Sequence, residues 1–233
     1  DEYTCSIIWY VEFFEALADF TGQGKYRLAR DRAFKWLMEN PVKDNNWQGF
    51  YGDMPGPGQV VSYDQWTALD TAMYLIDHRR EDATFLDKAR AVIKWCNETM
   101  VSYEGFHAGV PSLVEQTSYP AILTHHVVRL ADAYCRLYGA TGDEGCRRLA
   151  LEIANSASWL QKADGKFAHG LWYHAQASAY ILSFNSVYIR LMGEIPERAP
   201  PGENHLLLHS GDVRTVEYGD RRIIYSTWGP GRE

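Results

Sequence analysis

The sequence predicts a mainly α-helical protein built from helical hairpins and followed by a short β segment. Three observations lead to this fold class. Apolar residues recur at spacings of three and four along most of the chain up to Met192. Trp36, Trp95 and Trp159 end similar charged segments at separations of 59 and 64 residues, which indicates an internal repeat of about sixty residues. After Met192 the pattern alternates, as it does in strands.

The predicted helices fall into two alternating kinds. The second, fourth and sixth carry charge on one face, whereas the others are apolar around most of their circumference. Because helices that are apolar on most sides are buried, we expect the first, third, fifth and seventh to form an inner set and the rest an outer set. The seven predicted helices span residues 5–20, 25–39, 65–78, 83–98, 120–138, 144–162 and 173–192.

The connections between these helices differ in length. Links from an inner to an outer helix are short turns, whereas residues 40–64, 99–119 and 163–172 form long links from an outer helix to the next inner one. In an array of antiparallel hairpins all three long links lie at the same end, where each inner helix begins. Since long loops in a compact domain are usually functional, we expect a functional rim there.

The chain changes character after the last helix. Residues 194–203 have the composition of a linker, and residues 204–233 contain three alternating segments, with Gly219-Asp220 as a tight turn between the last two. This stretch is too short for an independent sheet domain. We therefore predict a helical part over residues 1–193, a linker, and either the start of a β-domain or a small sheet packed on the helices.

The composition narrows the classes of function. Hydrophobic residues make up 46%, charged residues 23% and aromatic residues 14%, and the net charge is −7. This charge, without a Lys/Arg cluster, argues against nucleic acid or an anionic membrane as a partner. No apolar run approaches the about 18 residues that a membrane span needs. Because the chain begins with neither Met nor a signal peptide, we expect a mature piece or a fragment.

No motif points to a metal or a cofactor. The four cysteines lack metal-type spacing, and most of them lie in helical patterns as small apolar residues, so a disulfide framework is not expected. The HExxH, GxGxxG, GxxxxGK[ST] and GxSxG patterns are absent. We therefore predict no metal site and no cofactor.

Each long link combines glycine with aromatic residues and with a histidine or a carboxylate. The first contains NNWQGFYGDMPGPG, in which three aromatic residues stand among four glycines. The apolar faces of a pyranose stack on aromatic rings, its hydroxyls bind polar side chains, and glycine lets the backbone approach a ligand. We therefore predict a sugar-binding rim, although packing on the helix ends is the alternative for each aromatic residue. The candidate substrate-binding residues are Asn46, Trp47, Gln48, Tyr51, Asp53, Trp66, His107, Tyr119, Trp172 and His174.

Asp64, Asp70 and His125 are the candidate catalytic residues. Asp64 stands where the third helix begins, and helix capping is its alternative role. Asp70 lies about one and two-thirds turns deeper, where a carboxylate in an apolar helix must find a partner. Hydrolysis of a glycosidic bond needs a proton donor and a second carboxylate. His125 lies near the start of the fifth helix, and its alternative is a structural role.

The segment TGQGKYRLARDRAFKWL and its copies, alternating with apolar helices such as YDQWTALDTAMYLI, resemble the α/α toroid of six-hairpin glycosidases and their relatives over about residues 3–192. A complete toroid has six hairpins, and this chain has about three and a half. The resemblance therefore implies an incomplete toroid, with further N-terminal hairpins in a parent protein. It also implies a carbohydrate substrate and a periplasmic or secreted location. In several polysaccharide lyases of this fold a β-sandwich follows the toroid, which fits the C-terminal β segment.

The resemblance leaves four functions open. Similarity to unsaturated-uronyl hydrolases nominates Asp64 and Asp70 as acid/base groups that cleave an oligo- or polysaccharide, including one that contains uronate. Similarity to toroidal lyases nominates Tyr119 or His125 as the base of a β-elimination, with Asn46 neutralising the uronate. The others are a sugar isomerase or epimerase, whose toroid uses histidines, and a non-catalytic sugar-binding or scaffold module. Fold resemblance does not decide between them.

Overall fold

The structure is a computed structural model, and it describes residues 7–47, 63, 65–105, 108–118, 120–162, 166–171, 181–195, 213–219 and 222–227. Most of these residues are helical, which confirms the predicted fold class. The helices are α1 (Ile7–Thr21), α2 (Gly24–Glu39), α3 (Pro41–Asp44), α4 (Gln65–Asp77), α5 (Phe85–Thr99), α6 (Thr124–Thr141), α7 (Glu144–Ser158) and α8 (Ile181–Glu194). The strands are β1 (Val101–Ser102), β2 (Ser112–Leu113), β3 (Val213–Gly219) and β4 (Arg222–Thr227).

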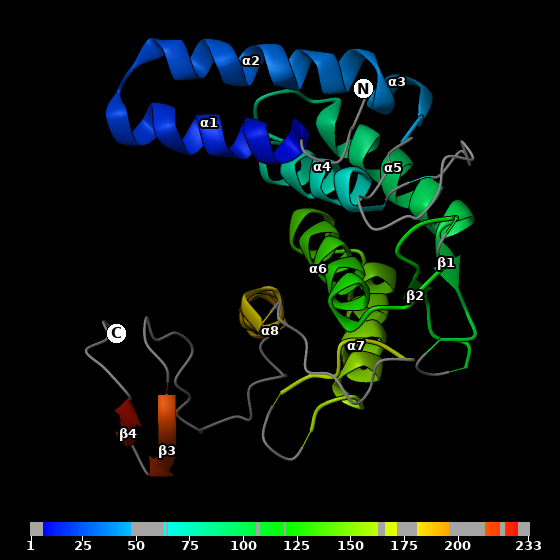
Figure 1. Cartoon of the computed structure of the whole chain (residues 1–233), viewed down its shortest axis with the longest axis vertical. Coiled ribbons are helices and arrows are strands. Elements are labelled where there is room, and N and C mark those ends of the chain that lie inside the picture. The colour runs from blue at the N-terminus through cyan, green and yellow to red at the C-terminus, as the bar shows by residue number, and fades with distance from the viewer. Residues whose placement is uncertain are drawn as a thin grey trace.

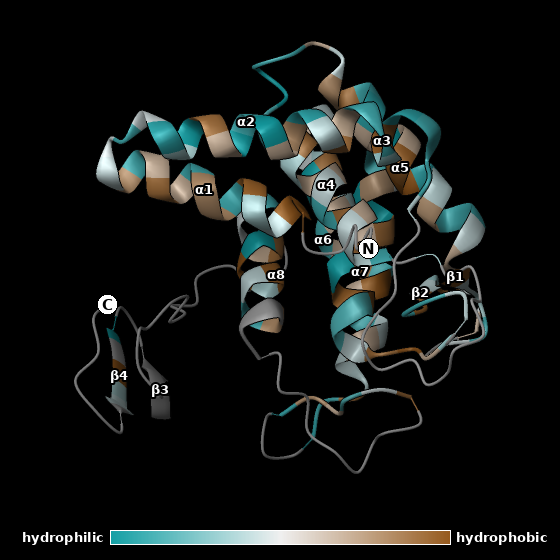
Figure 2. Ribbon diagram, turned by 45° about the horizontal axis from the view of Figure 1, so that its top comes forward, coloured by the Kyte–Doolittle hydropathy of each residue, from teal (hydrophilic) through white to brown (hydrophobic). Residues whose placement is uncertain are grey.

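The long helices form hairpins that stand side by side (Figure 1). The hairpins are α1–α2, α4–α5 and α6–α7, and α8 packs beside α6. Helices α1, α4, α6 and α8 form the inner row, because each of them contacts the next one in this series. The outer helices contact mainly their own hairpin partner, and much of the α2 ribbon in Figure 2 has the colour of hydrophilic residues.

Burial separates the two central inner helices, α4 and α6, from the outer row. Every residue of α4 from Gln65 to Ile76 is buried, whereas its outer partner α5 buries only one apolar face. The exceptions are the two inner helices at the ends of the row: α1, which was expected to be buried but has only Ile8, Val11 and Ala18 in the interior, and α8, in which Phe184, Val187 and Leu191 are the buried residues among those whose burial is described. This prediction was wrong because an apolar helix is buried only where other elements cover it.

Two helix boundaries differ from the prediction at the long links. Helix α6 begins at Thr124 and not at residue 120, because Ile122 and Leu123 form isolated bridges with Val114 and Gly170. Helix α7 ends at Ser158 and not at residue 162, since the chain turns there into the third link. Helix α8 runs from Ile181 to Glu194. Residues 173–180 of the corresponding predicted helix lie outside the described residues.

Side chains on neighbouring inner helices meet at nearly constant sequence separations. Trp9 and Asp70 are 61 residues apart, Trp66 and His126 are 60 apart, and Tyr74 and Glu15 are 59 apart. Each pair is hydrogen-bonded. Equivalent helices therefore stack in register, as the predicted repeat of about sixty residues requires.

The three long links meet at one end of the helical array, as predicted. The first and second are joined by Tyr63 N, which donates to Thr117 Oγ1 at 3.0 Å, and by Thr117 N, which donates back to Tyr63 O at 3.3 Å. The second and third are joined by Leu171 N, which donates to Ile122 O at 3.0 Å. We call this end, where α4 and α6 begin, the mouth.

The third link crosses the second so closely at Gly170 that a side chain there would collide. A Cβ atom on Gly170 would lie 2.7 Å from the carbonyl oxygen of Ile122 and 2.9 Å from Leu123 Cδ2. We expect Gly170→Ala to lower the free energy of unfolding by about 1–3 kcal/mol, because backbone must move to make room. Urea denaturation measures this, with Gly24→Ala as the control because nothing lies within 4 Å of that position. Equal denaturation midpoints for the two variants would contradict the expected crowding.

The C-terminal strands form an antiparallel ribbon, β3–β4, whose register places Val216 opposite Tyr225. The last pair is Gly219 with Arg222, so the predicted hairpin at this position is confirmed. The linker and the segment HLLLH lie outside the described residues. The assignment of residues 204–233 to the start of a β-domain stays a prediction.

Candidate functional site

Aromatic and charged side chains gather at the mouth from the first turns of three inner helices and from the third long link. Trp9 comes from α1, and its ring lies 5.2 Å from that of Trp66 on α4. Residues on the first two turns of α6 complete the group with one residue of the link. We call this group the mouth cluster: Trp9, Trp66, Asp70, His125, His126, Arg129 and His169.

Asp70 is held from two sides. The indole of Trp9 donates from Nε1 to Oδ2 at 2.8 Å, and the guanidinium of Arg129 forms an ion pair with Oδ1. The side chains are largely buried, with exposed fractions of 9% for Asp70 and 16% for Arg129. The prediction that this carboxylate finds a partner is therefore confirmed. Because two donors stabilise the ionised carboxylate, Asp70 is suited to accept hydrogen bonds and unsuited to donate a proton.

Trp66 is the centre of the cluster. Its Nε1–H donates to His126 Nε2, and the guanidinium carbon of Arg129 lies 5.0 Å from its ring centre. Only 7% of Trp66 is exposed. Since Nε2 of His126 accepts this bond, the proton of the neutral imidazole lies on Nδ1.

Three imidazoles lie together at the mouth. The ring centres of His125 and His126 are 4.0 Å apart, and those of His125 and His169 are 5.8 Å apart. Burial lowers the pKa of His125 to about 3, with a further contribution from His169. Burial likewise lowers the pKa of His126 well below its ordinary value. His125 and His126 are therefore neutral at pH 7; each neutral ring carries one hydrogen-bond donor and one acceptor, and the acceptor of His126 is already used by Trp66.

The mouth cluster is suited to binding an uncharged, hydroxyl-rich ligand. The charge of Arg129 is balanced by Asp70, and the two buried imidazoles are neutral. Trp9 and His169 are half-buried, so part of each residue is accessible to solvent. Within the described part of the chain, no group of three or more His, Cys, Asp or Glu side chains is placed to hold a metal ion.

Comparisons with known proteins identify the fold. No protein-family model matches the sequence, and no curated protein matches it. Among solved structures, an α-mannanase of glycoside hydrolase family 76 from Bacteroides thetaiotaomicron superposes with a TM-score of 0.60 at 12% identity, covering 84% of this chain and 54% of that one. An α-1,6-mannanase from Salegentibacter sp. HEL1_6 in complex with α-1,6-mannotetrose gives 0.58 at 14% identity, with coverages of 87% and 60%. A D-mannose isomerase gives 0.57 at 9% identity, with coverages of 84% and 55%.

The chain has the α/α-toroid fold. The resemblance predicted from the helical repeats is therefore confirmed at the level of fold. Identities of 9% to 14% show fold alone, and the chain spans 54% to 60% of the length of these three toroid proteins. No helix in the described part of this toroid has both the length and the apolarity to cross a bilayer.

The toroid places some of the predicted site residues at its mouth and others elsewhere. Asp70, His125 and Trp66 belong to the mouth cluster. Trp47 is fully buried in the hydrophobic core, 6.2 Å from the ring of Trp95, so it packs the first long link onto an outer helix. Asn46 is exposed beside it. The remaining candidates lie outside the described residues: Gln48, Tyr51, Asp53, Asp64, His107, Tyr119, Trp172 and His174.

Trp9 and Arg129 were not among the predicted site residues. The signal that could have found Trp9 is the repeat itself, because Trp9, Trp66 and His126 follow one another at separations of 57 and 60 residues in the first turns of successive inner helices. Arg129 follows from a similar offset, since it lies 59 residues after Asp70. Aligning the chain with itself would have paired both positions.

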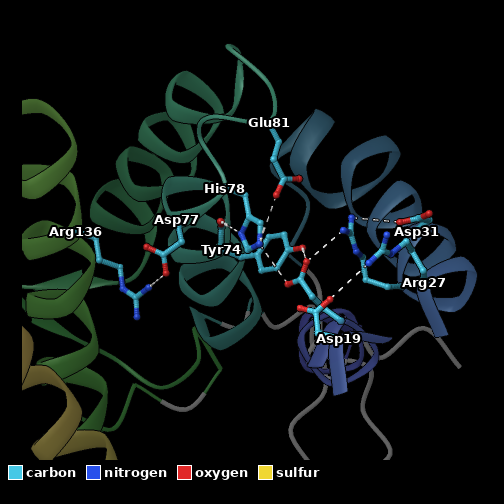
Figure 3. Close-up of polar contacts among 10 residues, drawn as sticks. Asp19, Arg27, Asp31, Tyr74, Asp77, His78, Glu81 and Arg136 are labelled. Carbon is cyan, nitrogen blue, oxygen red and sulfur yellow. Dashed lines mark hydrogen bonds and ion pairs between the residues drawn. The ribbon is translucent and has the colours of Figure 1, made fainter. Parts of the chain in front are cut away.

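A second polar cluster lies near the C-terminal end of α4, away from the mouth, and Figure 3 shows its side chains. Tyr74 donates from its hydroxyl to Glu15 at 3.1 Å, Arg30 pairs with the same carboxylate at 3.2 Å, and His78 lies 3.3 Å from it. A surface pocket of about 770 Å³ opens beside these groups. The groups named above, from α1, α2 and α4, are paired with one another. The cluster therefore joins α1 and α2 to α4.

Proposed function

We propose that this chain is part of a carbohydrate-active enzyme that hydrolyses a glycosidic bond, and that the mouth cluster forms part of its sugar-binding surface. The observation that carries the proposal is the gathering of indoles and neutral imidazoles where three long links meet at the mouth of an α/α toroid. The mannanase solved with α-1,6-mannotetrose supports a sugar ligand for this fold. Because identity is low, the function is argued from the site.

The properties of the cluster give each residue a role. The half-buried Trp9 is the candidate platform for the apolar face of a pyranose, and the half-buried His169 is the candidate partner for its hydroxyls. Asp70, which is ionised and oriented by two donors, supplies negative charge near the oxocarbenium-like transition state of glycoside cleavage. The proton donor must be another group, and Asp64, six residues before Asp70, is the sequence candidate for it.

The balance of charge favours a neutral sugar over a uronate. A uronate carboxylate needs an unpaired cation, whereas the guanidinium of Arg129 is already paired with Asp70. A mannose-containing oligosaccharide is therefore the first substrate class to test. The Salegentibacter mannanase was solved as an inactive variant with two adjacent aspartates replaced. This sequence contains no two consecutive aspartates, so that pair is not carried over.

The test follows sugar release and sugar binding in the same protein. The purified chain is incubated with α-1,6-mannotetraose, and reducing ends are quantified for wild type, Asp64→Asn and Asp70→Asn. We expect each variant to lose turnover by about 10²-fold or more, because Asp64→Asn removes the proposed proton donor and Asp70→Asn removes negative charge from the site of the transition state. Asp87→Asn on the outer helix α5, where the carboxylate is 80% exposed, is the control and should retain the wild-type rate.

Indole fluorescence separates binding from turnover. We expect mannotetraose to change the emission of wild type but to have little effect on Trp9→Phe, whereas Trp159→Phe, at the C-cap of the outer helix α7 where the residue is 74% exposed, should respond as wild type does. Saturable binding without any product would favour a non-catalytic module. Unchanged rates in both aspartate variants would refute the catalytic assignment.

A sugar isomerase is the second candidate, and the three clustered imidazoles favour it. The structural likeness to a D-mannose isomerase adds support at the level of fold. If this function is correct, D-mannose is converted to a ketose of unchanged mass, and His125→Gln and His169→Gln lose the conversion. None of the three reported neighbours is a polysaccharide lyase, and β-elimination is not part of the proposal. Export to the periplasm or the medium stays a prediction.

A further inference from the structure

The backbone of the third long link is fixed on both sides of His169. The amide of Ala168, just before it, donates to Leu160 O at 3.0 Å. The amide of Leu171, two residues after it, donates to Ile122 O at 3.0 Å. His169 itself is half-buried. This residue therefore sits in a short segment that is tied to the end of α7 and to the chain just before α6.

Thr124, the first residue of α6, binds the two carbonyl groups that flank the Cα atom of His169. Its hydroxyl donates from Oγ1 to Ala168 O at 2.7 Å, and its amide donates to His169 O at 3.0 Å. Thr124 is fully buried and Ala168 is 2% exposed, so bulk water is excluded from the hydroxyl bond. Because the direction of a side chain depends on the backbone at its own Cα, these two bonds set the direction in which the imidazole of His169 leaves the link.

The same contacts complete the start of α6. The N-cap residue is Leu123, which has no side-chain oxygen to accept from the first amides of the helix. The carbonyl oxygen of His169 accepts from the amide of Thr124 instead. His125 follows Thr124 in the chain, and its ring centre lies 5.8 Å from that of His169. Thr124 therefore joins the two segments that carry these imidazoles.

We propose that Thr124 is a positioning residue that holds the imidazole of His169 against His125 for binding the hydroxyl groups of a neutral sugar. The inference rests on the proposed function, in which His169 is the partner for these hydroxyls. Hydrogen bonds weaken steeply as their angle departs from linear, so a small rotation of the link at His169 weakens binding. Since Thr124 is fully buried, it acts on the ligand through His169 and not by direct contact.

The test replaces Thr124 with valine, which has a similar shape but no hydroxyl, and with serine, which keeps the hydroxyl. Calorimetric titration with α-1,6-mannotetraose measures the dissociation constant of each variant. We expect Thr124→Val to raise this constant about 3- to 10-fold, because one buried hydrogen bond to the link is lost. Thr124→Ser should stay within about twofold of wild type, since that bond is kept. Thr124→Ala removes the same hydroxyl without adding a methyl group and should weaken binding as valine does.

The matched control is the same substitution at the other end of α6. Thr141 is the last residue of this helix, and its hydroxyl donates to Leu137 O at 2.6 Å. Thr141→Val therefore removes a comparable bond to a carbonyl group without touching the third link. We expect this variant to bind mannotetraose as wild type does.

A double-mutant cycle separates positioning from a general loss of structure. If Thr124 acts through His169, then Thr124→Val should have no further effect on the dissociation constant once His169→Ala is present. A substitution that loosens the whole fold would weaken binding equally in both backgrounds. Hydrogen exchange gives a readout without sugar, because the Leu171 amide should exchange faster in Thr124→Val than in Thr124→Ser.

The outcomes distinguish this inference from the proposed function. Binding by wild type that Thr124→Val leaves unchanged would overturn the positioning role alone, and so would an equal loss with and without His169. If wild type does not bind mannotetraose at all, the sugar ligand is refuted and the inference with it.

Discussion

Replacing Arg129 with methionine is expected to lower the free energy of unfolding by about 3–5 kcal/mol, because the change leaves a buried carboxylate without its ion-pair partner. Asp70 is 9% exposed, so water cannot replace the guanidinium, and Trp9 supplies the remaining donor shown in the structure. The stack of Arg129 on the Trp66 ring is lost as well. Urea denaturation, with the slope checked for constancy, measures the change.

Two further variants distinguish a buried pair from an ordinary surface contact. Arg148 pairs with Glu152 on the surface of α7 and is 66% exposed, so Arg148→Met should cost no more than about 1 kcal/mol. The double variant Asp70→Leu/Arg129→Met should recover part of the loss, because neither charge then remains alone in the interior. A cost for Arg129→Met no larger than that of Arg148→Met would show that the pair is not buried in solution.

The second large effect is a loss of stability in acid caused by the two adjacent histidines of the mouth cluster. In the folded protein, burial holds the pKa of His125 at about 3 and that of His126 well below its ordinary value of 6.5. The unfolded chain binds protons at these residues near pH 6.5, so their stabilising contribution is complete above that pH and is lost as the pH falls toward the folded pKa. A histidine that stays neutral in the folded protein should then lower the free energy of unfolding by about 2 kcal/mol between pH 7 and pH 5.

The measurement is urea denaturation at pH 7 and pH 5 for wild type and for His125→Gln/His126→Gln. Carboxylates also titrate in this range, so the quantity to compare is the difference between the two proteins in the stability lost on acidification. We expect this difference to be about 4 kcal/mol if both imidazoles stay neutral in the folded state. The same loss in both proteins would mean that the histidines are solvated.

The outer helices could be predicted well because their sequences show a clear contrast between a charged face and an apolar face. Helix α5 alternates charged and apolar residues so that Phe85, Ala89 and Val92 lie on its buried face, and such a pattern defines a single amphipathic helix. Inner helices have no comparable contrast between faces. The sequence of α1 is as apolar as that of α4, yet only α4 is surrounded by other elements. Burial of such a helix depends on its neighbours, which a local pattern does not specify.

The site could be predicted in part. The lengths of the connections predicted a rim at this end, and Asp70, Trp66 and His125 lie there, while their catalytic and sugar-binding roles stay predictions. The direction of a loop aromatic could not be predicted, because a tryptophan in a glycine-rich segment can either stack on a ligand or pack the loop onto the hydrophobic core. Trp47 packs the loop onto the core, with its ring against that of Trp95. The start of α6 was misplaced because Pro120 is typical of a first helical turn, whereas bridges to the other links hold residues 122 and 123 extended.

The nearly constant offset between contacting inner helices also bears on how the protein unfolds. When each hairpin touches only the hairpins next to it, the total free energy is close to a sum of nearest-neighbour terms, and cooperativity is limited by the weakest interface in the series. Helix α1 contributes few buried residues to its interface with α4. In the 233-residue chain, the backbone amides of α1 should therefore exchange hydrogen when α1 alone opens. The amides of α4 and α6 should exchange more slowly, because they are exposed only when the whole chain unfolds.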